Sequence, residues 1–262
     1  MIRKVVKQLD SLILGNAIRK IIASKQEKQI LKHGSKGLKY SMNLQYAKND
    51  TSLLNTLCDN YGSDKGEVNP DDNPYSWPSH NYADFYDLIF GIRRHDVELV
   101  IECGLGTNNP NLSSSMGKNG MPGASLRVWQ DYFSRARIVG CDIDTDILFV
   151  ENRISTYECD QTDPFSIKNF TLAAELKDMS VDIIIDDGLH EFHAGKCFFE
   201  NMIKLLKADG IYVIEDVVPK DMCNYKEYFY SKDDTFEVRY VSLFSPKSSG
   251  GGDNRLIVIN KK

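Results

Sequence analysis

Two pairs of adjacent carboxylates mark the parts of this sequence best suited to chemistry. Asp186-Asp187 and Glu215-Asp216 follow apolar runs that predict strands over Val181–Asp186 and Ile211–Glu215. In an open parallel sheet, ligands bind beyond the carboxyl ends of the strands. Carboxylates gathered there repel one another unless a cation or protons compensate their charge, and such oxygen ligands favour Mg²⁺ or a similar ion. The alternative is ordinary strand-end acids that point apart.

A glycine-containing turn and a further acid predict a nucleoside site. The turn is Glu102-Cys103-Gly104-Leu105-Gly106, at the end of a buried strand predicted from Leu99. Glycine there allows a tight turn and close approach of a ligand to the backbone, although a purely structural turn would use the same residues. Asp142 ends the next predicted strand, Arg137–Asp142, where a carboxylate can accept hydrogen bonds from both ribose hydroxyls. Asp144 could compete for this role.

Asp160-Gln161 follows a further expected strand, and a side chain there could reach an adenine edge. Helices are predicted over Ser125–Phe133 and Cys197–Leu206, between the strands. Phe236–Leu243 and Leu256–Ile259 flank a Gly- and Ser-rich loop and predict an antiparallel hairpin. Short apolar runs joined by helices indicate parallel strands with crossover helices. The expected fold is α/β, a Rossmann-like, seven-stranded, mostly parallel sheet with helices on both faces.

The sequence before this alternation has a different character. Apolar residues at helical spacing over 2–22 predict an amphipathic helix that packs on the protein or on another subunit. A polar stretch from Gly62 to Pro78 predicts a long loop of the kind that often forms lids. We expect an N-terminal helical segment over 1–60, a lid-like loop and lead-in helix over 61–95, and the main domain over 96–262.

Composition narrows the function classes. The 262 residues carry a net charge of −5, yet residues 1–40 hold ten Lys/Arg against two Asp/Glu, so the remainder is acidic. This balance argues against nucleic-acid binding by the main domain. A membrane-surface role for the basic helix is the weaker alternative to packing, and no apolar stretch is long enough to predict a membrane span. Six cysteines without a CxxC pair predict free thiols in a reducing, cytoplasmic setting.

Taken together, the segment from about Asp96 to Asp216 resembles the class I S-adenosylmethionine-dependent methyltransferases. The resemblance implies that S-adenosylmethionine is bound by residues at the strand ends and at the segments that face them. We assign to this cofactor site Glu102, Gly104, Gly106, Ser125, Asp142, Asp160, Gln161, Asp186 and Lys65. One departure is the missing third glycine near Asn108. Thr107–Pro122 looks instead like an insertion, after which Gly123-Ala124-Ser125 restarts a helix.

A narrower resemblance rests on five motifs. They are Tyr61-Gly62-Ser63-Asp64-Lys65-Gly66, His80-Asn81-Tyr82, Gly123-Ala124-Ser125-Leu126-Arg127-Val128-Trp129, Asp186-Asp187-Gly188-Leu189-His190 and Glu215-Asp216. Together they resemble the metal-dependent sugar O-methyltransferases of the macrolide deoxysugar type. The resemblance implies that Asp187, Glu215 and Asp216 bind a divalent metal. It also implies that Asp187 and His190 are catalytic, with His190 as general base. Leu189 departs from the small polar residue expected at its position.

The implied reaction is an in-line methyl transfer from S-adenosylmethionine to a hydroxyl of a sugar, a nucleotide-sugar-like compound or another small polar acceptor. The metal eases loss of the hydroxyl proton, and His190 takes that proton. His193 is the rival base, and Lys65 with Tyr82 is expected to help cover the cofactor. Two other function classes stay open: an NAD-dependent oxidoreductase, which the incomplete glycine motif disfavours, and a non-catalytic nucleoside-binding scaffold subunit. A homo-oligomer is also left open.

Overall fold

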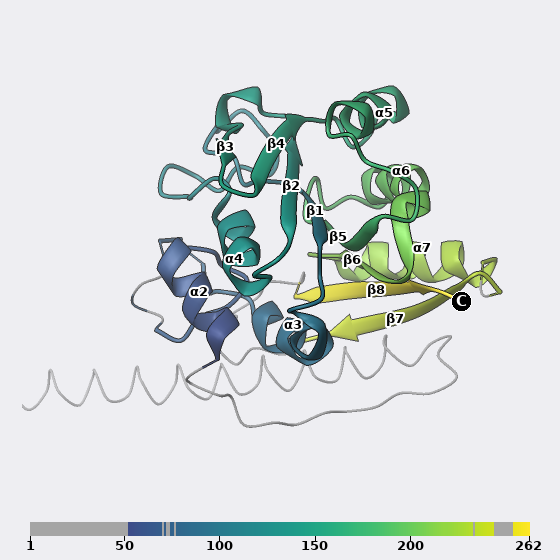
Figure 1. The fold of residues 1–262 in the computed structure, drawn as a ribbon, viewed down its shortest axis with the longest axis horizontal. Coiled ribbons are helices and arrows are strands. Elements are labelled where there is room, and N and C mark those ends of the chain that lie inside the picture. Colours follow the sequence, from purple (N-terminus) through teal and green to yellow (C-terminus); the bar gives the residue numbers. More distant parts are fainter. Residues whose placement is uncertain (1–51, 70, 72–73, 76, 233, 244–253) are drawn as a thin grey trace, which may run out of the picture.

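The computed structural model describes residues 52–69, 71, 74–75, 77–232, 234–243 and 254–262 (Figure 1). The amphipathic helix predicted over residues 2–22 lies outside these residues and stays a prediction. The predicted boundary at residue 60 falls near the end of the first described helix, α2 (Leu53–Tyr61). An irregular stretch then leads to α3 (Tyr82–Phe90).

A twisted sheet forms the centre of the described chain. Its order is β3-β4-β2-β1-β5-β6-β8-β7. The strands are β1 (Leu99–Cys103), β2 (Arg137–Asp142), β3 (Val150–Glu151), β4 (Ile154–Glu158), β5 (Val181–Asp186), β6 (Leu206–Ile214), β7 (Phe236–Ser242) and β8 (Arg255–Lys261). The five neighbouring strands β4, β2, β1, β5 and β6 are parallel to one another. The strands β3, β8 and β7 are antiparallel to their neighbours. The mostly parallel, Rossmann-like sheet is therefore confirmed.

Within the described residues the sheet has eight strands, one more than the sequence predicts. The smallest one, β3, has two exposed residues, Val150 and Glu151, which pair with β4. Two residues are too few to produce a period-2 pattern, so the sequence gives no signal for this strand.

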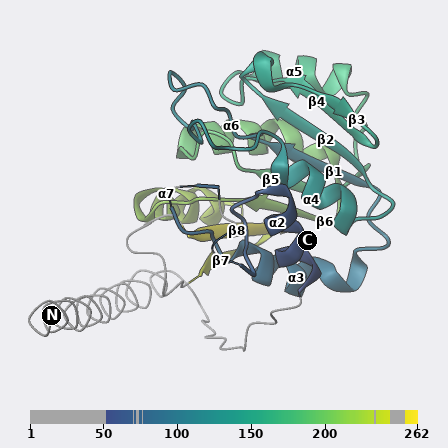
Figure 2. The same ribbon diagram turned by 90° about the vertical axis from the view of Figure 1, so that its left-hand side faces the viewer.

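Helices cover both faces of the sheet (Figures 1 and 2). On one face, α2, α3 and α4 (Ala124–Tyr132) pack against the sheet through an aromatic cluster that includes Tyr86, Trp129 and Tyr132. On the other face, α5 (Pro164–Ala173), α6 (Phe192–Met202) and α7 (Pro219–Tyr230) bury a second cluster, which includes Phe198 and Phe229. The sheet lies between two apolar layers, which is why its central strands are apolar throughout.

The agreement with the predicted elements is uneven. The predicted ranges of β2 and β5 match the structure residue for residue, and the C-terminal hairpin of β7 and β8 is confirmed. The helix predicted from Cys197 begins at Phe192 instead and ends at Met202 in a 3-10 turn. The strand predicted from Ile211 begins earlier, at Leu206. Its first residues are largely polar and its pairing with β5 is irregular there, so the apolar pattern in the sequence starts only at Ile211.

Two further observations bear on the sequence predictions. All six cysteines are free thiols, and Cys103 and Cys141 are buried in β1 and β2 as expected. In the part of the chain that the structure describes, no helix is both long enough and apolar enough to cross a bilayer.

Candidate active site

A cavity of about 600 Å³ opens at the carboxyl ends of the parallel strands. The connection after β1 and the ends of β2, β4, β5 and β6 line one side of it. The segment between α2 and α3 lines the other side with Asp64, Lys65, Trp77 and His80. Predicted cofactor, metal and base residues therefore meet in one space, since all of these elements converge at this edge of the sheet.

The two glycines after β1 have positive φ angles, +92° at Gly104 and +79° at Gly106. A Cβ on Gly104 would lie 2.0 Å from the carbonyl oxygen of Asp187, and one on Gly106 would lie 1.9 Å from Met116 Sδ. The turn thus packs directly against the residue that follows β5 and against the inserted loop. Both glycines line the cavity with their backbones.

The loop from Thr107 to Pro122, predicted as an insertion, has no regular secondary structure and closes on itself. Met116 N donates to Thr107 O over 2.8 Å. Asn108 Nδ2 donates to Gly117 O over 2.5 Å and to Gly120 O over 3.0 Å. Asn108, near which the third glycine was expected, therefore pins the loop instead. Ser114, Ser115 and Met116 of this loop line the cavity.

Asp142 lines the cavity, whereas its rival Asp144 does not. The carboxylate of Asp142 accepts hydrogen bonds from Leu105 N over 2.7 Å and from Asp144 N over 2.9 Å. Burial raises the pKa of Asp142, and these two amides work against that rise. Asp144 instead accepts hydrogen bonds from Thr107 Oγ1 and Asp146 N. Asp142 therefore has the better position for a ribose, and its oxygens retain lone pairs for further donors.

Asp160, Gln161 and Ser125 also line the cavity. Gln161 is occupied at both ends of its amide: Nε2 donates to Asp186 Oδ1 over 2.9 Å, and Oε1 accepts from Leu189 N over 2.5 Å. It thereby ties the end of β5 to the loop that carries His190. Asp160 accepts from Thr162 N and Thr162 Oγ1 through Oδ1.

Two predicted cofactor residues, Glu102 and Asp186, do not line the cavity. Glu102 is fully buried, and its Oε2 accepts from Trp129 Nε1 over 2.6 Å. Asp186 points toward a small void beside Gly195 and Tyr225, and its Oδ2 has no hydrogen-bond partner among the described residues. Burial raises the pKa of Asp186 to about 6. Any contribution of these two acids to cofactor binding is therefore indirect, because neither residue lines the cavity.

Lys65 brings three carboxylates together at the floor of the cavity. Its Nζ lies 2.6 Å from Glu215 Oε2, 2.7 Å from Asp187 Oδ2 and 3.3 Å from Glu102 Oε1. The residue is only 3% exposed. Burial disfavours its charge, but the three carboxylates prevail and hold the pKa of Lys65 well above its usual value. Tyr86 donates to the other oxygen of Glu215 over 2.5 Å.

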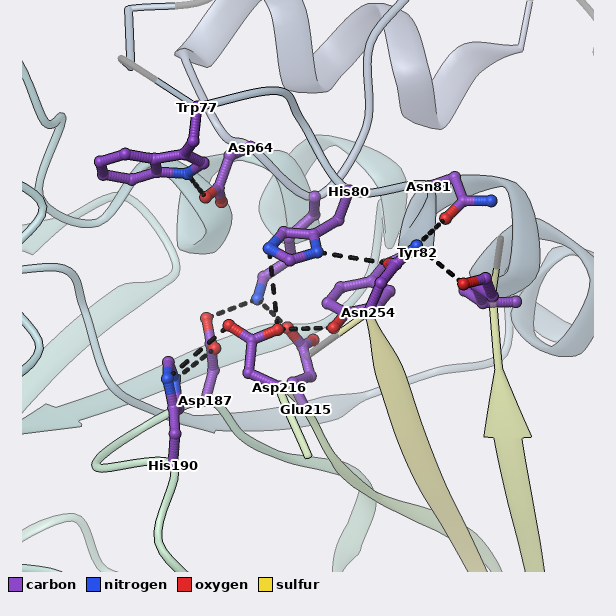
Figure 3. Close-up of polar contacts among 12 residues, drawn as sticks. Asp64, Trp77, His80, Asn81, Tyr82, Asp187, His190, Glu215, Asp216 and Asn254 are labelled. Carbon is purple, nitrogen blue, oxygen red and sulfur yellow. Dashed lines mark hydrogen bonds and ion pairs between the residues drawn. The ribbon is translucent and has the colours of Figure 1, made fainter. Parts of the chain in front are cut away.

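Asp216 lies in the centre of Figure 3, facing a histidine on either side. Tyr82 donates to Asp216 Oδ1 over 2.5 Å, and His80 Nε2 lies 3.7 Å from the same oxygen. The ring of His80 stacks on Tyr82, and its Nδ1 lies 3.3 Å from Asn254 Oδ1. Since Asn254 Nδ2 donates to Asn81 and Leu243, its Oδ1 faces His80, and Nδ1 is the donor.

His190 lies on the other side of the acidic group. Its Nε2 is 3.2 Å from Asp187 Oδ1, and its Nδ1 is 3.7 Å from Asp216 Oδ2. Burial opposes the charged ring, but the hydrogen bond to Asp187 and the charge of Asp216 prevail and raise the pKa of His190 to about 10. These same carboxylates must be compensated before the ring can accept a proton near neutral pH. The rival base His193 is exposed, pairs with Glu191 and does not line the cavity.

A divalent cation fits this site. Ligand atoms of Asp187, His190 and Asp216 lie within 4.8 Å of one another, the only such group among the described residues. The two carboxylates suit Mg²⁺ or a similar hard ion, and the imidazole beside them is then left for proton transfer. Asp187 and Asp216 are thus brought together as predicted. The third predicted ligand, Glu215, could reach an ion only with oxygens that already accept from Lys65 and Tyr86.

Sequence reasoning missed the partners that position these acids. Lys65 was expected to cover the cofactor, yet its ammonium reaches Asp187 and Glu215 across separations of 122 and 150 residues. His80 and Asn254 had no assigned role, although His80 stands in one of the five motifs. For Lys65 and His80, the available signal was that the five motifs could all belong to one site. Asn254 stands in none of these motifs.

Comparison with known proteins finds methyltransferases among both the sequence relatives and the solved structures. No protein-family model matches the chain. The 8-demethyl-8-alpha-L-rhamnosyl tetracenomycin-C 2'-O-methyltransferase of Streptomyces olivaceus is 30% identical over 168 residues, 64% of this chain and 38% of that protein. Demethylmacrocin O-methyltransferase of Streptomyces fradiae is 34% identical over 143 residues, 54% of this chain and 33% of that protein. The chain therefore spans less than two-fifths of the length of these two curated relatives.

The fold is also similar to a solved structure. The MycE methyltransferase from the mycinamycin biosynthetic pathway, in complex with Mg, SAH and mycinamycin VI, aligns with a TM-score of 0.55 and 22% identity. The alignment covers 82% of this chain and 55% of MycE. At this identity the likeness supports the fold. The chain thus shares its Rossmann-like fold with a methyltransferase, and the two curated relatives are O-methyltransferases, the first of them acting on a rhamnosyl compound.

Proposed function

We propose that this chain is an S-adenosylmethionine-dependent O-methyltransferase that methylates a hydroxyl of a sugar or another small polar acceptor with the help of a divalent cation. The observation that carries the proposal is the single cavity that Asp142, Asp187, His190 and Asp216 all line. A nucleoside-binding acid and a cation-binding group in one cavity fit a reaction between a nucleoside cofactor and an oxygen nucleophile. The named activities of the sequence relatives support the same reaction class.

We place the cofactor in the part of the cavity that the carboxyl ends of β1, β2 and β4 line. The backbone at Gly104 and Gly106 lines the part of the cavity that would take methionine, Asp142 would accept from the ribose, and Asp160 would border the adenine. Ile143 is 53% exposed and lines the same region, which gives the base an apolar surface. Gln161 contributes by fixing the loop that follows β5 rather than by a free amide.

The acceptor end is the side of Asp64, Trp77, His80 and Asn254. Trp77 Nε1 donates to Asp64 Oδ2 over 2.9 Å, and the indole stacks on Tyr75, so the ring is held in place (Figure 3). An aromatic face beside carboxylate, imidazole and amide groups suits a hydroxyl-rich acceptor such as a sugar ring. The proposal therefore names a class of acceptor, a hydroxyl-rich molecule such as a sugar, and no particular acceptor or methylated position.

Asp187 and Asp216 would hold the cation beside the acceptor hydroxyl. When bound, a divalent cation lowers the pKa of a neighbouring hydroxyl and orients its oxygen. His190 then receives the hydroxyl proton as the oxygen forms a bond to the methyl carbon and the sulfonium sulfur keeps the electrons of the broken C–S bond. Asp187 and His190 are therefore the residues that we propose to be catalytic.

Two other classes are less well supported. An NAD-dependent oxidoreductase needs no carboxylate–imidazole group of this kind, and a nucleoside-binding scaffold needs no base at the acceptor end. The division at residues 60 and 95, a homo-oligomer and a reducing, cytoplasmic setting stay predictions. The free cysteines are consistent with the last of these.

The proposal can be tested without knowing the natural acceptor. The purified protein is incubated with methyl-labelled S-adenosylmethionine, Mg²⁺ and a panel of rhamnosides, free deoxysugars and nucleotide-sugars. We expect labelled product from at least one sugar hydroxyl, together with binding of S-adenosylhomocysteine in calorimetry. Binding of NAD with no binding of S-adenosylhomocysteine would support the oxidoreductase alternative instead.

A further inference from the structure

Lys65 forms the least expected feature of the site, a buried ammonium shared by three carboxylates. Glu102, Asp187 and Glu215 each have a carboxylate oxygen within 3.3 Å of its Nζ. Asp216 adds a fourth carboxylate nearby; burial and the charge of Asp187 raise its pKa, while His80 and His190 oppose this rise. Lys65 is therefore the permanent positive charge beside four carboxylates, and the rings of His80 and His190 are the titratable ones.

Asp187 is the residue that joins this cage to the candidate cation site. Its Oδ2 accepts from Lys65 at 2.7 Å, while its Oδ1 lies 3.2 Å from His190 Nε2 on the side of Asp216. Lys65 and His190 hold the pKa of Asp187 well below its usual range, against the effect of burial. An ion bound by Asp187 and Asp216 would thus share a ligand with Lys65, and like charges that share a ligand weaken each other's binding.

The backbone around Lys65 is held rigidly. Lys65 O accepts from Ala83 N over 2.8 Å, at the start of α3. A Cβ on Gly66 would lie 2.5 Å from Ala83 Cβ and 2.6 Å from Asn55 Oδ1, so the chain packs tightly between α2 and α3. The ammonium is therefore delivered to a fixed point by elements that precede the sheet.

We propose that Lys65 is an internal cation that competes with the divalent ion for one carboxylate cluster. It keeps Asp187 and Glu215 in place when no ion is bound, and it lowers the affinity of the cluster for the ion. The inference rests on the proposed metal-assisted function, because it assumes that the ion binds at Asp187 and Asp216. Lys65 is in this sense a positioning residue for the cation site.

Lys65→Met provides the test. Removal of one partner from a buried ion pair is strongly destabilising, so the variant should melt about 10 °C below the wild type in EDTA. Saturating Mg²⁺ should restore at least half of that loss, whereas it should shift the wild type much less. Mn²⁺, measured by electron paramagnetic resonance, should bind at least tenfold more tightly to the variant, because a competing charge is gone.

Lys207→Met is the matched control. Lys207 Nζ lies 2.8 Å from the buried Asp182 Oδ1, at the opposite end of β6 from Glu215. Its replacement also removes a lysine from a buried carboxylate, but away from the cavity. We expect some loss of stability that Mg²⁺ does not reverse, and wild-type affinity for Mn²⁺.

Lys65→Gln keeps hydrogen-bond donors without the charge, and the same Mn²⁺ result is expected from it. The inference is overturned if either folded variant binds Mn²⁺ no more tightly than the wild type, or if Mg²⁺ fails to restore stability. It is also overturned if neither variant folds in saturating Mg²⁺, since the ion then cannot replace the ammonium. If Mn²⁺ binds to neither wild type nor variants, the metal-assisted function itself fails.

Discussion

At the scale of single residues, Asp142 carries the cofactor assignment. Asp142→Ala should weaken the binding of S-adenosylhomocysteine by about 10- to 100-fold, which corresponds to lost hydrogen bonds with a buried partner. Asp144→Ala is the matched control, because Asp144 follows closely in sequence but does not line the cavity. Calorimetry on both variants decides the matter. Equal affinities for wild type and Asp142→Ala would remove Asp142 from the site.

His190 carries the assignment of the base. His190→Ala should lower the turnover number by about 10²- to 10⁴-fold and leave the affinity for S-adenosylhomocysteine nearly unchanged. His193→Ala should retain wild-type turnover, because its ring is exposed and pairs with Glu191. The two variants are compared with the same acceptor at saturating Mg²⁺. An inactive His193→Ala beside an active His190→Ala would reassign the base.

Residue types at strand ends could be predicted from the sequence, but the neighbours that fix their charge could not. Asp142, Asp187 and Asp216 follow apolar strands, so their meeting at one edge of the sheet follows from topology. Lys65 is different, because it lies in irregular chain before the sheet, and no periodicity relates it to acids more than 100 residues away. The same holds for Asn254, which orients His80.

At the scale of elements, the turn after β1 joins the glycine motif to the metal side. Gly104→Ala would place a Cβ 2.0 Å from Asp187 O and force φ of +92° on an alanine. The backbone at Asp187 would have to move, so we expect both a lower melting temperature and weaker binding of S-adenosylhomocysteine.

Gly117→Ala is the control for this change. Gly117 also has a positive φ, +71°, but a Cβ there meets nothing within 4 Å among the described residues. It should therefore show only the cost of a left-handed alanine, about 1–2 kcal/mol. The melting temperature of Gly104→Ala should fall at least twice as far as that of Gly117→Ala. Similar melting temperatures would show that the turn does not pack tightly on Asp187.

Elements with continuous apolar runs were predictable, and those with mixed residues were less so. β2 and β5 have buried residues at nearly every position, and their bounds agree with the sequence prediction. α6 begins with Phe192 and His193, and its first turn lacks the apolar repeat that marks Cys197 onward. Polar residues hid the first part of β6, before Ile211, in the same way, because pattern alone cannot assign residues whose strand pairing depends on the tertiary fold.

At the scale of the whole molecule, the fold brings two chemistries to one cavity. The strand ends supply the groups that suit a nucleoside and a cation, and the segment between α2 and α3 supplies Lys65, Trp77 and His80 from the opposite side. Reaction between two bound molecules needs both sides in place, since their correct mutual positioning provides much of the rate enhancement.

The most direct test of the central claim separates the cation from the cofactor. Methyl transfer from S-adenosylmethionine to an accepted sugar is measured in excess EDTA and after Mg²⁺ is restored, with calorimetry of S-adenosylhomocysteine under both conditions. The account predicts that chelation abolishes most turnover, that Mg²⁺ restores it, and that cofactor affinity changes little, since Asp187 and Asp216 serve the acceptor side. Full methyl transfer in excess EDTA would contradict it.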